Sequence, residues 1–222
     1  MEKSCYDKAC LFDMDGVLVD TEPIWAEAIQ FALARRGVNL SFQEVSQLEN
    51  GRAWPEIFQD IARQWPNAYA TRQEMEAITV PFYQCAVASR DVSIPASVEL
   101  LRRLAEDGYP VVIVSGSARH RIQEVMGMLG ISTLVKAIVS HEDCPHGKPA
   151  PDSYLLAAEK LHCPPSRCVV FEDSTAGVQA AKAAGMTCVA LCRPQSLPQD
   201  LSQADLIVES LANVNLNKLF HS

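Results

Sequence analysis

Short apolar runs recur along the chain, and each predicts a buried strand. They lie at residues 9–12, 110–114, 137–139, 168–171, 187–192 and 206–208. Runs of this length, bounded by polar or turn residues, are typical of strands that are covered on both faces of a sheet.

Between these runs, apolar residues recur with helical spacing. In residues 97–107, Val98, Leu101 and Leu104 fall on one face, and Gly108 follows as a stop signal. Similar patterns cover residues 119–129, 151–161 and 176–184. Strands that alternate with helices predict an α/β fold with a doubly wound, Rossmann-like parallel sheet.

Residues 23–90 break this alternation. They contain helical stretches at 23–35 and 56–64, and Pro23 suits a first helical turn. No convincing strand pattern occurs there. We therefore predict a small all-helical cap domain at 23–90, inserted after the first strand of a catalytic core formed by residues 1–22 and 91–222.

Composition restricts the classes of function. The chain has 222 residues, of which 48% are hydrophobic and 21% charged, and its net charge is −8. An acidic chain without a Lys/Arg run is a poor candidate for binding nucleic acid or anionic membranes. We expect a small phosphorylated metabolite as partner and a monomer, with a homodimer as the alternative.

The cysteines and the first residues bear on the compartment. The eight cysteines form no Cys-x-x-Cys pair, and several lie inside apolar runs, which favours free buried thiols over a disulfide framework. Residues 1–8 include Glu2 and Asp7 and lack the apolar region of a signal peptide. We therefore expect a cytoplasmic protein.

Carboxylates cluster where two predicted strands end. Asp13 and Asp15 follow the first strand two residues apart, and Glu172-Asp173 follow the run at 168–171. In an open parallel sheet these ends meet at the edge where ligands bind. Because four carboxylates there would repel one another, a divalent cation is expected, and oxygen ligands favour Mg²⁺.

Groups suited to a phosphate ester accompany the carboxylates. Ser115, Gly116 and Ser117 follow another strand, where a hydroxyl and backbone N–H groups could hold an anion. Lys148, within Gly-Lys-Pro, supplies positive charge. Taken singly, each of these motifs is more often a turn, a loop or a helix cap, but together they predict phosphoryl transfer.

The full set of motifs resembles the haloacid dehalogenase superfamily, specifically its beta-phosphoglucomutase-like phosphatases. The matching stretches are residues 12–23 (FDMDGVLVDTEP), 114–117 (VSGS), 147–152 (GKPAPD) and 170–174 (VFEDS), followed by Gly177. They run in the order of that family and span most of the chain, and the helical insertion resembles its mobile cap.

This resemblance implies a role for each catalytic residue. Asp13 would be the nucleophile that becomes an aspartyl phosphate. Asp15 would be the general acid for the leaving alcohol and then the base for water. Ser115 and Lys148 would hold the transferring phosphoryl group, so the predicted enzyme is a phosphoric monoester hydrolase.

The resemblance also implies how the metal is held. Mg²⁺ would bind Asp13, the backbone carbonyl of Asp15 and Asp173, with Glu172 as a direct or water-mediated ligand. Residues 16–20 would form a flap that couples movement of the cap to the site.

One departure bears on the reaction. Beta-phosphoglucomutases carry a His shortly after the flap, where this chain has Trp25, which favours a phosphatase over a sugar phosphomutase. Trp25, Trp54 and Arg52 could shape the pocket or pack the cap, and Arg119 could contact a second anionic group or lie exposed. A sugar or sugar-alcohol phosphate is the expected substrate, and a catalytically silent sugar-phosphate-binding regulator is a further alternative.

Overall fold

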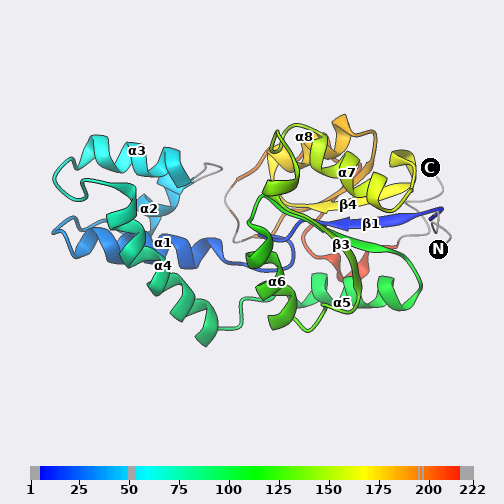
Figure 1. The fold of residues 1–222 in the computed structure, drawn as a ribbon, viewed down its shortest axis with the longest axis horizontal. Helices are drawn as coiled ribbons and strands as arrows, with labels where there is room; N and C mark the ends of the chain where they lie inside the picture. Colours follow the sequence, from blue (N-terminus) through cyan, green and yellow to red (C-terminus); the bar gives the residue numbers. More distant parts are fainter. Residues whose placement is uncertain (1–5, 50–53, 195, 197, 216–222) are drawn as a thin grey trace. The chain divides into compact units, whose positions relative to one another are not determined.

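The structure is a computed structural model that describes residues 6–49, 54–194, 196 and 198–215. It divides the chain into two compact units (Figure 1). The core unit comprises Met1–Val19 and Ser93–Ser222, and the helical unit comprises Asp20–Val92. The predicted cap, residues 23–90, lies within the helical unit.

A parallel sheet forms the centre of the core unit. Its strands are β1 (Ala9–Phe12), β2 (Val111–Val114), β3 (Val135–Val139), β4 (Cys168–Glu172), β5 (Thr187–Leu191) and β6 (Leu206–Val208). The strand order is β3-β2-β1-β4-β5-β6, and every pairing is parallel. The prediction of a doubly wound parallel sheet is therefore confirmed, and the order reverses direction at β1, where such sheets bind ligands.

Helices cover both faces of this sheet. They are α5 (Pro95–Glu106), α6 (Arg119–Met128), α7 (Asp152–Lys160) and α8 (Thr175–Ala183), with short 3₁₀ turns at η1 (His141–Asp143), η2 (Pro165–Arg167) and η3 (Leu211–Asn213). In Figure 1, α7 and α8 lie on one side of the sheet and α5 and α6 on the other. The predicted stop signal after α5 is confirmed, because Gly108 has a φ of 87° there.

Alternating strand residues build the core on the side of α7 and α8. Leu11, Val112 and Val170 point to that side and pack with Tyr154 of α7 and Val178 of α8. All five are completely buried. This packing fixes the carboxyl ends of β1, β2 and β4, from which the candidate site residues emerge.

The helical unit consists of α1 (Glu22–Ala34), α2 (Phe42–Glu49), α3 (Trp54–Gln64) and α4 (Arg72–Ser89) within its described residues. Its core includes Ile29, Leu33, Ile61 and Met75. The first turn of α1 carries Trp25, whose ring stacks on Tyr83 with centroids 4.2 Å apart and lies 6.1 Å from Trp54. These contacts support a packing role for both tryptophans, and Arg52 lies outside the described residues.

The chain enters and leaves the helical unit at adjacent points. Asp20 N donates to Val92 O at 2.8 Å at the ends of the helical unit. At the ends of the core unit, Val19 pairs with Ser93 in an antiparallel bridge. Among the described residues, no helix is long and apolar enough to span a membrane, and the cysteines described are free thiols.

Candidate active site

The loop after β1 is a tight turn that presents the first two carboxylates. Asp13 N donates to Phe171 O at 3.0 Å, which continues the pairing of β1 with β4 and leaves the Asp13 side chain at the end of the strand. Gly16 follows with a φ of 83°. A Cβ at Gly16 would lie 1.8 Å from Asp173 Oδ2, so only glycine lets the Asp173 carboxylate approach this loop.

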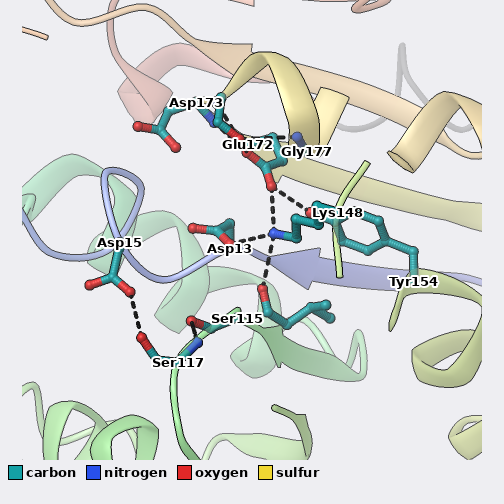
Figure 2. A network of polar contacts seen from close by, with 11 residues as sticks. Asp13, Asp15, Ser115, Ser117, Lys148, Tyr154, Glu172, Asp173 and Gly177 are labelled. Carbon is teal, nitrogen blue, oxygen red and sulfur yellow. Dashed lines mark hydrogen bonds and ion pairs between the residues drawn. The ribbon is translucent and has the colours of Figure 1, made fainter. Parts of the chain in front are cut away.

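Lys148 lies at the centre of the site (Figure 2). Its Nζ donates to Asp13 Oδ1 at 2.5 Å and to Glu172 Oε1 at 2.6 Å, with a longer contact of 3.4 Å to Val114 O. The predicted nucleophile and the predicted phosphate-binding lysine are therefore adjacent, although 135 residues separate them in the sequence.

Glu172 is completely buried, and hydrogen bonds occupy both of its carboxylate oxygens. Oε1 accepts from Lys148 Nζ and from the Tyr154 hydroxyl. Oε2 accepts from the backbone N–H groups of Asp173 and Ser174 and from the Ser174 hydroxyl. Although burial alone would raise the pKa of Glu172, Lys148 and these donors hold it below its usual value.

Gly177 leaves the space that Glu172 occupies. A Cβ at this position would lie 1.8 Å from Glu172 Oε1. Gly177 N also donates to Ser174 Oγ at 3.0 Å, which caps the first turn of α8. The glycine in the sequence motif is therefore explained by close approach of a buried carboxylate.

Burial is the largest influence on the pKa of the Asp13 carboxyl group. The residue is 8% exposed, and burial raises the pKa of its carboxyl group to about 8, with Lys148 acting against this rise and Glu172 adding to it. Lys148 responds in the opposite way: burial alone would lower its pKa, but Asp13 and Glu172 raise it well above the usual value.

The loop after β2 faces Asp15. Ser115 is buried, and its hydroxyl accepts a hydrogen bond from Ser117 N at 3.0 Å. The Ser117 hydroxyl donates to Asp15 Oδ2 at 3.0 Å. Figure 2 shows the Asp15 carboxylate directed toward Ser117, while Asp13 is directed toward Lys148. The two aspartates thus have different partners, and the contact between Ser117 and Asp15 was not predicted from the sequence.

Arg119, at the start of α6, is engaged within the protein. Its guanidinium forms an ion pair with Asp143 Oδ2 at 2.5 Å, and its backbone N–H donates to Glu142. This pair faces the turn at Ser140, which donates to the same Asp143 oxygen. Binding of a second substrate anion by Arg119 stays a prediction and would compete with this ion pair.

The donor set fits the expected metal in part. In the described part of the chain, no group of three or more His, Cys, Asp or Glu side chains is arranged to hold a metal ion. Protein donors contact both oxygens of the Glu172 carboxylate, and the set of metal ligands expected from the sequence (Asp13, Asp15, Glu172 and Asp173) stays a prediction. The carboxylates of Asp13 and Asp173 and the Asp15 carbonyl are the hard oxygen donors that suit Mg²⁺, and Gly16 lets Asp173 reach their loop.

Comparisons with known proteins show which family this chain belongs to. A model of the haloacid dehalogenase-like hydrolases matches residues 8–185. Fructose-1-phosphate phosphatase YqaB of Escherichia coli is 33% identical over 184 residues, covering 81% of this chain and 93% of the relative. Hexitol phosphatase B of the same organism is 31% identical over 189 residues, covering 85% of each chain.

A solved structure of another protein resembles this chain in both sequence and fold. A haloacid dehalogenase family hydrolase from Deinococcus radiodurans, crystallised with bound phosphate and sodium, is 32% identical, with a TM-score of 0.77 over 96% of this chain and 95% of that one. The family model and the phosphatase relatives confirm the prediction of a phosphoric monoester hydrolase. The chain belongs to the haloacid dehalogenase-like hydrolase family.

Proposed function

We propose that this enzyme is a Mg²⁺-dependent phosphatase that hydrolyses small sugar or sugar-alcohol phosphates through an aspartyl phosphate on Asp13. The contact of Lys148 Nζ with Asp13 Oδ1 supports the proposal most strongly. With this contact, a positive charge lies beside the proposed nucleophile, where the negative charge of a phosphoryl group would develop during transfer.

In the first step, an Asp13 oxygen attacks phosphorus while the bond from phosphorus to the ester oxygen breaks. Lys148 and the Ser115 hydroxyl would bind oxygens of the transferring group. Asp15 would donate a proton to the departing alkoxide, which in a sugar phosphate is a poor leaving group. The hydrogen bond from Ser117 would hold the Asp15 side chain in place for this transfer.

In the second step, water attacks the aspartyl phosphate. Asp15, now ionised, takes a proton from that water, and the bond between the Asp13 oxygen and phosphorus breaks. The products are inorganic phosphate, the Asp13 carboxylate and protonated Asp15, so the enzyme returns to its starting state.

Asp13, Asp173 and the backbone carbonyl of Asp15 would hold Mg²⁺ in this proposal. When bound, the ion supplies positive charge that neutralises the phosphoryl oxygens and the clustered carboxylates. Glu172 would position other groups of the site, because its oxygens accept hydrogen bonds from Lys148 and from the backbone N–H of Ser174 at the start of α8.

The substrate class is proposed from the relatives, which act on fructose 1-phosphate and hexitol phosphates by their names. A panel of phosphorylated metabolites, assayed for released phosphate with Mg²⁺ and with excess chelator, tests both proposals. We expect turnover of sugar or hexitol phosphates that chelation abolishes and added Mg²⁺ restores. Full activity in chelator would contradict the metal proposal.

The same panel separates an enzyme from a silent binding protein. The silent alternative requires that no phosphate be released although the ligand binds. The Asp173→Ala variant serves as a control, because it should lose most turnover while its circular dichroism spectrum stays that of the wild type.

A further inference from the structure

Tyr154 is a buried side chain at the site that no sequence motif assigned to catalysis. It lies in α7, six residues after Lys148, and is completely buried. Its hydroxyl donates to Glu172 Oε1 at 2.8 Å, and the same oxygen accepts from Lys148 Nζ at 2.6 Å. Tyrosine and lysine therefore share one acceptor on a buried carboxylate (Figure 2).

Lys148 has competing partners in this network. Its ammonium contacts Asp13 on one side and Glu172 on the other, at 2.5 and 2.6 Å. It also lies 5.0 Å from the centroid of the Tyr154 ring, within the range of a cation–π interaction. Any change in the charge on Glu172 Oε1 alters how strongly that oxygen attracts Lys148 away from Asp13.

The Tyr154 hydroxyl acts as a donor in this network. An ionised carboxylate oxygen can only accept a hydrogen bond, so the proton of this contact belongs to the Tyr154 hydroxyl. A donated hydrogen bond withdraws electron density from Oε1 and satisfies one of its lone pairs. The oxygen then attracts the lysine less strongly.

We propose that Tyr154 is a positioning residue: its hydroxyl limits the hold of Glu172 on Lys148 and so keeps the ammonium directed at Asp13 and the transferring phosphoryl group. This inference rests on the proposed function, because it assigns Tyr154 a part in the same site. Tyr154 acts through Glu172 and Lys148 and does not touch the reacting atoms.

Tyr154→Phe tests the hydroxyl alone, since the ring stays in place. We expect kcat/KM for p-nitrophenyl phosphate to fall about tenfold, the size of effect that one hydrogen bond to a charged group gives. Tyr69→Phe is a matched control, because the Tyr69 hydroxyl is buried and donates to Ala32 O at 2.7 Å within the helical unit. It should lose comparable stability and keep the wild-type kcat/KM.

A double-mutant cycle with Glu172→Gln separates positioning from packing. The amide oxygen of Gln carries no full charge, so it should not capture the ammonium, and Tyr154→Phe should then change kcat/KM less than about twofold. An equal loss in both backgrounds, or no loss in the wild-type background, would overturn the inference.

A second readout does not depend on activity. The ¹⁵N resonance of the Lys148 ammonium, assigned by its disappearance in Lys148→Arg, should shift in Tyr154→Phe and stay unchanged in Tyr69→Phe. An unshifted resonance in Tyr154→Phe would refute the positioning role. If the wild type releases no phosphate from any ester, the proposed function fails, and the ammonium spectrum still decides the part of Tyr154.

Discussion

Asp15 is the residue on which both proposed proton transfers depend. p-Nitrophenolate leaves without a proton, so the first step on p-nitrophenyl phosphate should survive the loss of Asp15. The second step still needs a base, and such help is commonly worth ~10²–10⁴-fold. Asp15→Asn should therefore release a burst of about one p-nitrophenol per active site and then nearly stop, as followed by rapid-mixing absorbance.

The burst product identifies the nucleophile. Its mass should include one phosphoryl group on Asp13 that hydroxylamine removes, and Asp13→Asn should show neither burst nor added mass. Steady turnover of Asp15→Asn at the wild-type rate would exclude Asp15 as the acid–base. Phosphate found on Ser115 would reassign the nucleophile.

Trp25 is the residue on which the prediction of hydrolysis, rather than phosphoryl transfer within one sugar, depends. It stands where the related mutases carry His, and its ring is stacked on Tyr83. We expect beta-glucose 1-phosphate, if it reacts, to yield glucose and free phosphate, as measured by coupled assays for glucose, glucose 6-phosphate and phosphate. Net formation of glucose 6-phosphate with little released phosphate would favour a mutase instead.

At the scale of elements, the first turn of α8 can pack against Glu172 only because residue 177 is a glycine. Gly177→Ala would place a Cβ 1.8 Å from Glu172 Oε1 and should lower the free energy of unfolding by about 1–3 kcal/mol, as overpacking does. It should also reduce kcat, because a displaced Glu172 moves Lys148 out of its position beside Asp13. Chemical denaturation and p-nitrophenyl phosphate turnover measure the two effects.

Gly127→Ala is the matched control for this substitution. Gly127 lies inside α6, and a Cβ there meets no atom within 4 Å apart from neighbouring backbone of its own helix. Alanine should therefore stabilise the helix by up to about 1 kcal/mol and leave turnover unchanged. If both substitutions change stability alike, the close approach of Glu172 to Gly177 does not constrain the fold.

Helices and strands with a strong apolar pattern could be predicted from the sequence. Helices that depend on capping side chains or on packing were harder to predict. The strands that carry the site are apolar runs that end in polar residues. Two helices, α2 and α4, were not predicted as separate elements, although Ser41 and Glu44 hydrogen-bond each other at the start of α2 and Thr71 caps α4. Pro81 inside α4 also obscures its helical pattern.

The candidate site shows the same division. Strand ends were enough to expect Asp13, Ser115 and Glu172 at one sheet edge, because parallel strands bring their ends together. Lys148 was expected there only because a phosphate ester needs positive charge beside it. The sequence could not show that Lys148 donates a hydrogen bond to the Glu172 carboxylate, since that contact depends on the directions of the side chains in three dimensions. Tyr154 has no sequence signal of its own, because a buried tyrosine on a helix face usually only packs.

At the scale of the whole molecule, four distant segments supply one charged site. They are the loop after β1, the loop after β2, the segment that leads into α7, and the junction of β4 with α8. The sheet holds them together with hydrogen bonds and apolar packing, while the carboxylates oppose one another. The stability of the metal-free protein should therefore depend on the protonation of this site.

Asp13 determines the sign of that dependence. The pKa of its carboxyl group is about 8 in the folded protein, against 3.8 for an unperturbed aspartate. Between these pH values the folded state keeps a proton that the unfolded state has lost, so the contribution of Asp13 to stability is complete below pH 3.8 and is lost as the pH rises to about 8. An asparagine side chain does not titrate, so Asp13→Asn should remove this contribution to the pH dependence of stability.

We therefore expect Asp13→Asn to melt at a higher temperature than the wild type in chelator at pH 8, by at least ~3 °C, the shift that about 1 kcal/mol gives in a domain of this size. The difference in melting temperature should be much smaller at about pH 5, close to the unperturbed pKa. At that pH, ionisation of Asp13 in the unfolded wild type stabilises the unfolded state only a little. Mg²⁺ at pH 8 should raise the melting temperature of the wild type by mass action and that of the variant less, because an amide is a weaker ligand than a carboxylate. Calorimetry at both pH values, with Mg²⁺ and with chelator, measures these differences. Parallel pH profiles for the two proteins would show that Asp13 titrates as an ordinary carboxylate, and an equal response to Mg²⁺ would show that the ion binds elsewhere.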